Sequence, residues 1–278
     1  MIKVSAIVLT FNEENYIRDC LESLRWCKEI WIVDSGSIDK TLDICREFTE
    51  NIVYHPFKNY STQRQWAVNL PIKTDWILFI DSDERVPPAL AQEINHRLAE
   101  DQGRIAGYYI SRKQYYWGKC LMHGEPWPNY RMLLFQKDRI RFSGREVHEH
   151  ASVDGPTGFI KSPSIHIAFD NIAEIVEKLN KYATLDAIRM FRTGQELYAV
   201  ESGSYSRLNT LLKRIFAWLP HKPFFIFVYY YFFRRGFLDG REGFAWTLMQ
   251  GFYVWLSYFK LWELKQGITH LPDEEADD

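Results

Sequence analysis

The chain has 278 residues, of which 46% are hydrophobic, 16% aromatic and 25% charged, and its formal net charge at pH 7 is −2. This length predicts one large domain, or one domain with an appendage, and the apolar content is enough for a buried core. The slightly acidic balance argues against nucleic acid as the main partner, because surfaces that bind nucleic acid are strongly basic. The cysteines have neither CxxC spacing nor histidines at zinc spacing, so reduced buried thiols are expected rather than a metal or redox site.

The first half of the chain alternates between short apolar runs and segments with helical spacing. The runs expected to form strands are Val4 to Leu9, Ile30 to Val33, Ile52 to Tyr54 and Trp76 to Ile80. The segments expected to form helices are 17–24, 41–48, 61–70 with Ser61 or Thr62 as its cap, and one that begins at Pro87-Pro88. The order β-α-β-α-β-α-β predicts an α/β fold with a parallel sheet and right-handed crossovers.

Polar side chains follow three of the expected strands, at Thr10 to Glu13, Asp34 to Ser37 and Asp81 to Asp83. The carboxyl ends of parallel strands lie along one edge of a sheet, where open α/β sheets bind ligands. We therefore expect one site at this edge, with side chains suited to a nucleotide. The sequence contains neither the phosphate loop GxxxxGK[ST] nor a GxGxxG after the first strand, so both of those site classes are excluded. Taken singly, each of the three segments also fits an ordinary turn.

Asp81 and Asp83 stand two residues apart, directly after an apolar run typical of a strand that is buried on both faces. In an extended backbone this spacing puts both carboxylates on one side. Two such groups repel each other unless a cation lies between them. Oxygen ligands in small number suit Mg²⁺ or Mn²⁺, whose other ligands are commonly phosphate oxygens and water. The pair therefore predicts a divalent metal site.

Three segments carry a resemblance to a known family: VSAIVLTFNEE at 4–14, VDSGS at 33–37 and FIDSDERV at 79–86. In this order they resemble the family 2 glycosyltransferases and, within that family, the small β-glucosyltransferases of the lipopolysaccharide core. The match covers roughly residues 1–170. It implies a GT-A fold, which is Rossmann-like with a mostly parallel central sheet. It also implies a nucleotide-sugar donor, with UDP as the nucleotide, and inversion at the anomeric carbon.

The same resemblance implies roles for individual residues. Those it places on the nucleotide-sugar are Thr10, Glu13, Asp34, Arg64, Asp81 and Ser82. Asp81 and Asp83 match the family's DxD motif, which would bind Mn²⁺ or Mg²⁺ together with the diphosphate. The chain departs from the family pattern at Ile38 and Lys40, where threonine and glycine are usual, and at Asn129, where aspartate is frequent.

A second dense polar cluster, Arg145 to His150, resembles the family's Val-His-Glu motif. Direct inverting transfer needs a base that takes the proton of the acceptor hydroxyl as its oxygen attacks. We assign Glu149 as this base, with Glu146 as the substitute. His148 would orient Glu149 or approach the metal ion, and His166 is the rival third metal ligand. For each histidine, a structural hydrogen bond is the alternative.

The second half of the chain differs in character from the first. Apolar residues recur at three and four from Ile172 to Ile188, which predicts an amphipathic helix of about 20 residues. Between residues 207 and 241, seven lysines and arginines accompany one acidic residue, Asp239. Aromatic runs at 223–233 and 244–259 are shorter than the roughly 20 apolar residues that a membrane span requires.

Aromatic rings bordered by basic residues are typical of the headgroup level of a membrane. We therefore expect interfacial helices on the cytoplasmic face of the inner membrane, since the chain enters a strand directly without a signal peptide. A helical subdomain with an aromatic core, or a dimer contact, is the alternative. The expected organisation is a catalytic domain at 1–170, a helical portion at 171–272 and an acidic tail at 273–278.

These observations predict an inverting, metal-dependent glycosyltransferase. Its partners would be a nucleotide-sugar donor and a lipopolysaccharide-core or lipid-linked acceptor, with peripheral membrane contact and no nucleic acid. One alternative is transfer to a polyprenyl phosphate, although such relatives commonly carry clear spanning helices. The other is a non-catalytic nucleotide-binding membrane scaffold, which would not need Asp81, Asp83 and Glu149.

Overall fold

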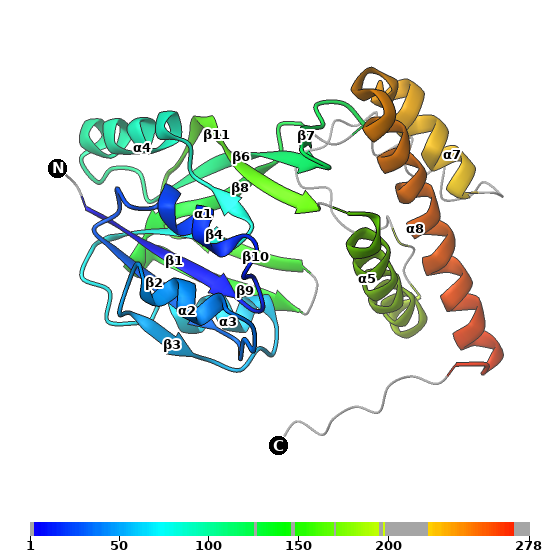
Figure 1. Ribbon diagram of the computed structural model, residues 1–278, viewed down its shortest axis with the longest axis horizontal. Helices are drawn as coiled ribbons and strands as arrows, with labels where there is room; N and C mark the ends of the chain where they lie inside the picture. Colours follow the sequence, from blue (N-terminus) through cyan, green and yellow to red (C-terminus); the bar gives the residue numbers. More distant parts are fainter. Residues whose placement is uncertain are drawn as a thin grey trace. The chain divides into compact units, whose positions relative to one another are not determined.

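The computed structural model describes residues 3–124, 127–145, 148–169, 171–194, 197 and 222–269. The chain divides into two compact units (Figure 1). One unit comprises Met1–Tyr115 and Pro128–Ala168, and the other comprises Tyr116–Trp127 and Phe169–Asp278. The segment 116–127, which leaves the first unit between two of its strands, thus groups with the C-terminal helices.

The first unit begins with the predicted β-α-β-α-β-α-β order. Its strands are β1 (Val4–Thr10), β2 (Glu29–Asp34), β3 (Ile52–Tyr54) and β4 (Trp76–Asp81), and its helices are α1 (Ile17–Ser23), α2 (Thr41–Arg46) and α3 (Tyr60–Ala67). All four strands pair in parallel, in the order β3-β2-β1-β4. The predicted helices and strands are confirmed, but the cap of α3 is not. Asn59 caps this helix by accepting a hydrogen bond from the Thr62 N–H, so neither Ser61 nor Thr62 does.

Beyond β4 the sheet becomes mixed, which corrects the expectation of a mostly parallel sheet. The remaining elements of this unit are β5 (Glu84–Arg85), α4 (Pro88–Asp101), β6 (Gly107–Tyr116), β8 (Tyr130–Gln136), η1 (Lys137–Arg139), β9 (Ile140–Arg145), β10 (His148–Val153) and β11 (Thr157–Phe169). The sheet continues β4-β8-β6-β11-β5, and β8 is antiparallel to both β4 and β6. The reason is that β8 follows β6 without a helical crossover, which a parallel pair would need.

The core lies on both faces of this sheet. Alternate residues of β4 enter different clusters: Leu78 and Ile80 pack with the α1 and α4 side chains, whereas Ile77 and Phe79 pack with those of α3 and β9. Every residue from Trp76 to Ile80 is buried, as the uninterrupted apolar run predicted. This buried strand fixes the position at which Asp81 leaves the sheet.

The second unit is helical, with the short strand β7 (Lys119–Cys120) in its loop. Its helical segments are α5 (Ile172–Thr193), α7 (Lys222–Val228), the π-helical η2 (Tyr229–Phe233), the 3-10 helix η3 (Gly236–Asp239) and α8 (Gly240–Gln266). α5 confirms the predicted amphipathic helix and packs on α8. α7 also packs on α8, at Gly251, where an added Cβ would lie 3.0 Å from the Pro223 carbonyl oxygen.

None of the helices in the described ranges is long and apolar enough to cross a membrane. Part of the predicted basic segment and the whole acidic tail, 273–278, lie outside the described residues. Lys119 and His123 contact the segment that leads into α8: the Lys119 ammonium donates to the Asp239 carbonyl oxygen at 2.6 Å, and the His123 N–H donates to the Asp239 carboxylate at 2.7 Å. Asp239 is only 5% exposed, so it anchors this loop within the unit.

Candidate active site

The ends of three strands meet along one edge of the sheet, as the sequence predicted. In the parallel register, Thr10 pairs with Asp34 on one side of β1, and Leu9 pairs with Asp81 on the other. Thr10, Asp34 and Asp81 therefore leave the sheet at the same level. The Thr10 hydroxyl is buried and has no hydrogen-bond partner among the described residues, so it is available to a ligand.

The two loops that follow β1 and β2 hold each other in place. Asn12 adopts a left-handed backbone conformation with φ of 54°, and its side-chain oxygen accepts the Ile38 N–H at 2.8 Å. In return, the Ser37 hydroxyl accepts the Asn12 N–H at 2.9 Å. The Glu13 N–H donates to the Thr41 hydroxyl at 2.7 Å. At Ile38 the bond is made by the backbone N–H and not by the side chain. The turn therefore forms although isoleucine replaces the threonine that is usual in the family.

Asp34 shapes the turn that follows it. One of its oxygens accepts the N–H groups of Gly36 and Ser37 at 2.8 and 2.9 Å, and the other accepts the Ser37 hydroxyl at 2.5 Å. Gly36 has φ of 103°, a conformation that side chains rarely adopt. Asp34 is only 3% exposed. The carboxylate is thus largely used within its own turn, and its contact with a base or ribose stays a prediction.

Asp81 lies between two buried arginines. Arg64, from α3, donates to Asp81 Oδ1 at 2.8 Å, and Arg112, from β6, lies 3.9 Å from Asp81 Oδ2. Loss of water contact disfavours the charged carboxylate, but Arg64 and then Arg112 outweigh this effect, so the pKa of Asp81 is lowered. Arg64, predicted to lie near the nucleotide, does reach the acidic edge.

Glu84 is the most deeply buried carboxylate of the edge, with 1% of its side chain exposed. Arg112 donates to it at 2.9 Å. Burial raises the pKa of Glu84, against the opposing effect of the Arg112 charge. Arg112 therefore connects Asp81 and Glu84 across the loop that contains Asp83. Ser82, in the same loop, is buried, and its carbonyl oxygen accepts from Arg85.

Asp83 faces a histidine. The Nε2 atom of His166, from β11, lies 3.0 Å from Asp83 Oδ2, while the other ring nitrogen contacts the side-chain oxygen of Gln114, from β6. Because an amide oxygen can only accept, Nδ1 carries a proton there, and Nε2 meets the carboxylate with a second proton or a lone pair. The other oxygen of Asp83, Oδ1, is buried and has no hydrogen-bond partner in the described ranges of the chain.

These contacts test whether the edge fits a metal ion. Asp83 and His166 supply one carboxylate and one imidazole, and the unpartnered Asp83 Oδ1 gives the fit its structural support. Asp81 is instead engaged by Arg64. No group of three or more histidine, cysteine, aspartate or glutamate side chains in the described ranges could hold a metal ion by itself. The residues present therefore fit an ion that takes its remaining ligands from a substrate and water.

The predicted base lies in a short antiparallel ribbon. Strand β10 pairs with β9, and Glu149 is opposite Gly144. The side chains of Glu149 and His148, and the whole of Glu146, lie outside the described residues. Their assignments as base, orienting group and substitute stay predictions.

Sequence reasoning missed several residues of this edge, among them Glu84, Arg112 and Gln114. Glu84 belongs to the charged run after β4, so its position in the sequence could have indicated a site residue. The predicted metal site used only Asp81 and Asp83 of that run. Arg112 and Gln114 lie on β6 at alternate positions, so both point to one face. The spacing of these two residues in the sequence did not indicate which site their side chains would reach.

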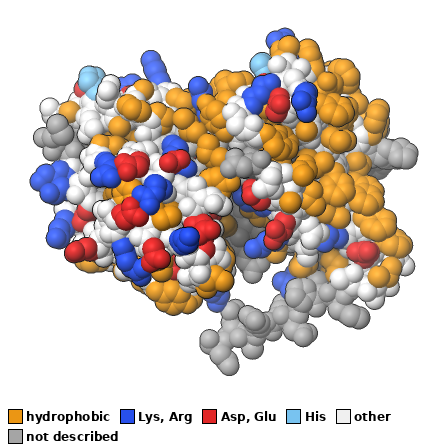
Figure 2. All heavy atoms as spheres, viewed as in Figure 1, with side chains coloured by type: hydrophobic (Ala, Val, Ile, Leu, Met, Phe, Trp, Pro, Cys, Tyr) orange, Lys and Arg blue, Asp and Glu red, His pale blue; other side chains and the backbone are white. Residues whose placement is uncertain are grey.

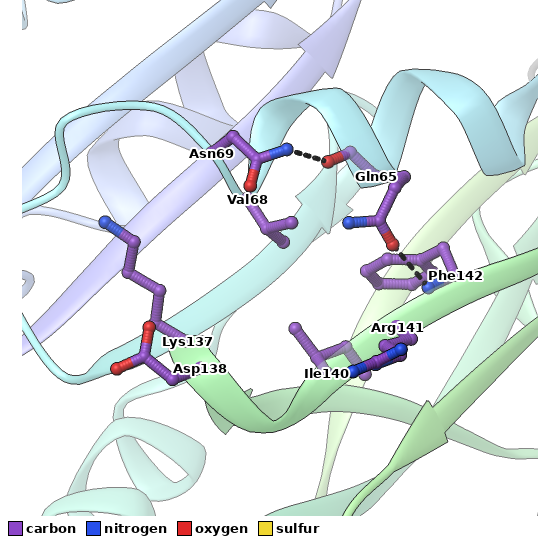
Figure 3. A pocket seen from close by; sticks show the side chains of 8 residues that line it. All are labelled: Gln65, Val68, Asn69, Lys137, Asp138, Ile140, Arg141 and Phe142. Carbon is purple, nitrogen blue, oxygen red and sulfur yellow. Dashed lines mark hydrogen bonds between the residues drawn. The ribbon is translucent and has the colours of Figure 1, made fainter.

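A separate hollow lies between α3 and the η1–β9 segment (Figure 3). Gln65 accepts the Phe142 N–H there at 2.8 Å, and the Asn69 side chain donates to the Gln65 carbonyl oxygen. Lys137, which also lines it, donates its backbone N–H to the Asp75 carbonyl oxygen, beside the amino end of β4. None of the predicted site residues lines this hollow. It is distinct from the acidic edge.

Parallel strands whose carboxyl ends gather arginines, carboxylates and a histidine define an α/β protein with a candidate ligand site at the edge of its sheet. The chain belongs to glycosyl transferase family 2: residues 5–152 match that family. It is 30% identical over 270 residues to the lipopolysaccharide core biosynthesis glycosyltransferase LpsC of Rhizobium meliloti (strain 1021), covering 94% of this chain and 93% of the relative.

Two solved structures are also similar. The crystal structure of S. aureus TarS 1-349 in complex with UDP-GlcNAc shares 15% identity with a TM-score of 0.45, covering 96% of this chain and 92% of that one. The crystal structure of glucosyl-3-phosphoglycerate synthase from Mycobacterium tuberculosis in complex with Mg²⁺ and uridine-diphosphate shares 15% identity with a TM-score of 0.43, covering 73% and 82% of the two chains.

Proposed function

We propose that this protein is an inverting, metal-dependent glycosyltransferase that moves a sugar from a UDP-linked donor to a lipopolysaccharide-core or other lipid-linked glycan. The observation that carries the proposal is the set of charged side chains at the strand ends of a chain that belongs to glycosyl transferase family 2. LpsC, a relative that is similar over nearly the whole chain, is named for lipopolysaccharide core biosynthesis, which supports this class of acceptor. The family resemblance supports the nucleotide.

Each part of the edge has a task in this reaction. Thr10 and the paired loops after β1 and β2 would bind the base and ribose, while Arg64 would approach the nucleotide. Asp83 and His166 would hold Mn²⁺ or Mg²⁺. When bound, the ion would stabilise the negative charge that develops on the leaving diphosphate. Gln114 would keep His166 in the tautomer with the Nδ1 proton, so that Nε2 points to Asp83.

Glu149 would take the proton from the acceptor hydroxyl. We expect Glu149→Gln to reduce turnover at least about 100-fold, since a positioned general base contributes that much or more. The measurement is the rate at which a panel of nucleotide-sugars is hydrolysed in the presence of Mn²⁺, monitored as the nucleoside diphosphate that is released. The control is Glu50→Gln, which changes an exposed glutamate.

This experiment also separates the enzyme from the non-catalytic scaffold. Wild-type protein that binds a nucleotide-sugar with Mn²⁺ but never hydrolyses or transfers it would favour the scaffold. Hydrolysis that is equally fast in the Glu149→Gln variant would remove Glu149 from the mechanism, and Glu146→Gln would then be the next variant. A product formed with polyprenyl phosphate as the acceptor would favour the alternative enzyme.

We also propose peripheral contact with the cytoplasmic face of the inner membrane through the second unit. Large apolar side chains are exposed along α8, where Phe244, Leu248, Trp255, Phe259 and Trp262 lie within one stripe of helical spacing. Figure 2 shows hydrophobic side chains gathered over α7 and α8. Arg235 and Arg241 are exposed beside this stripe in the sequence. Aromatic and basic groups together suit an anionic lipid surface.

A vesicle-binding assay tests this contact. We expect the double variant Trp255→Ser/Trp262→Ser to bind vesicles of phosphatidylglycerol and phosphatidylcholine at least about tenfold more weakly, because two large apolar side chains no longer enter the interface. Phe57→Ser, at an exposed aromatic of the first unit, is the matched control. A double variant that binds as well as wild type would refute the contact. A change in oligomeric state instead would favour the dimer alternative.

A further inference from the structure

Six ionisable side chains gather at the carboxyl end of β4, and their pairing is uneven. They are the guanidinium groups of Arg64, Arg112 and Arg131 and the carboxylates of Asp81, Asp83 and Glu84. Arg64 donates to Asp81, Arg112 donates to Glu84, and Asp83 faces His166. Among the residues that the structure describes, Arg131 is the arginine of this set that forms no hydrogen bond or ion pair.

The strand register places Arg131 at the acidic edge. In the β6–β8 pair, Ile110 is opposite Arg131, and Arg112 follows Ile110 by two residues on the same face. The β4–β8 pairing ends at Leu78 and Leu134, before Asp81 and Arg131, but the charges of Asp81 and Glu84 still act on Arg131. Arg131 is thus a diagonal cross-strand neighbour of Arg112.

Arg131 is exposed, and the carboxylates whose charges act on it, Asp81 and Glu84, make no ion pair with it in the described part of the chain. Its side chain is exposed, and among the residues that the structure describes it makes no hydrogen bond and no ion pair. The pKa of Arg131 is lowered, mainly because of the like charge of Arg112. Like charges held this near each other favour an anion between or beside them.

Arg112 also has an N–H donor without an acceptor among the described residues. It is 7% exposed, and its Nε–H is buried without a hydrogen-bond partner. A guanidinium group carries five N–H donors in a planar fork that fits the oxygens of phosphate or carboxylate. The donors of Arg112 that Glu84 leaves unused, and those of Arg131, are therefore suited to an oxyanion from outside the protein.

We propose that Arg131, with Arg112 behind it, forms a subsite for a phosphate group of a bound ligand. The proposal deepens the proposed function and rests on it for the choice of phosphate, which is carried by the donor diphosphate and also by a phosphorylated glycan acceptor. In the first case the subsite holds the leaving group, and in the second it selects the acceptor. Both sources share the same phosphate–guanidinium chemistry.

Calorimetric titration of Arg131→Gln tests the subsite, beside Arg131→Lys and the control Arg141→Gln, which changes an exposed arginine on β9. The ligands are UDP, uridine and pyrophosphate with Mn²⁺, and inorganic phosphate added to protein saturated with UDP. Because Arg131 is exposed, the variant should unfold at the wild-type temperature. A charged hydrogen bond of this kind corresponds to an affinity change of about tenfold to a hundredfold.

If the subsite holds the donor diphosphate, Arg131→Gln binds UDP about tenfold or more weakly, binds uridine unchanged, and Arg131→Lys lies between. If it holds an acceptor phosphate, UDP binding is unchanged, and inorganic phosphate no longer binds the UDP-loaded variant. Wild-type-like binding of both UDP and phosphate by Arg131→Gln overturns the subsite. Pyrophosphate binding that depends on Arg131 in a protein that binds no nucleotide would support the subsite and refute the proposed function. Wild-type protein that binds neither phosphate compound would overturn both.

Discussion

Asp83→Asn is expected to weaken Mn²⁺ binding and to reduce turnover, each by at least about 100-fold, while the protein remains folded. Asp83 is the edge carboxylate with a buried oxygen that has no hydrogen-bond partner in the structure. The substitution keeps the size of the side chain but removes the negative charge that the ion needs. Mutation of a residue that hydrogen-bonds to a metal ligand typically lowers metal affinity about 10- to 100-fold. Mutation of the ligand itself should lower the affinity at least as much.

The measurement is Mn²⁺ titration followed by electron paramagnetic resonance, which reports binding without any turnover. Thermal unfolding is measured in parallel and should shift little, since an asparagine amide can pair with His166 Nε2 in either state: its oxygen accepts from a protonated Nε2, and its NH2 group donates to an Nε2 lone pair. Asp43→Asn is the control, because Asp43 is a largely exposed carboxylate paired with Arg46 on α2. Normal Mn²⁺ binding and normal sugar transfer by Asp83→Asn would exclude the metal site proposed for this residue.

The acidic edge could be predicted because its signals are local. Each of β1, β2 and β4 is a buried apolar run, and Thr10, Asp34 and Asp81 are the polar residues with which these runs end. In a parallel sheet such ends share an edge whatever the details of the loops. The four strands, their parallel arrangement and three site positions follow from this pattern alone.

The remainder of the site depends on contacts between distant parts of the chain. Arg112 and Arg131 reach the edge on β6 and β8, whose order in the sheet differs from their order in the sequence. Periodicity predicts that such strands exist but not which neighbour each will pair with. For the same reason, the sequence pattern did not indicate that Asp81 would be held by arginines, or that Asp34 would use its oxygens within its own turn.

Arg112→Met is expected to destabilise the protein by about 3–5 kcal/mol at neutral pH, although it removes only one charged side chain. Glu84 is 1% exposed and accepts from Arg112 at 2.9 Å, so the substitution leaves a carboxylate buried without a counter-charge. Methionine fills much of the volume of the arginine stem, so the cost comes chiefly from the charge. Urea unfolding followed by circular dichroism gives the free energy of unfolding. Lys113→Met, at the next position of β6 with its side chain on the opposite face, is the control.

The loss should depend on pH and on Glu84. Without Arg112, the pKa of Glu84, already raised by burial from its ordinary value of 4.5, rises further. The folded state then binds more protons than the unfolded state between about pH 4.5 and the raised pKa, so the stability of the variant is greatest below about pH 4.5 and falls as pH rises to the raised pKa. The double variant Arg112→Met/Glu84→Gln should recover most of the loss at pH 7, because no buried charge is left. If the double variant were as unstable as Arg112→Met, or if the loss were the same at pH 5 and pH 8, packing rather than the buried charge would account for the role of Arg112.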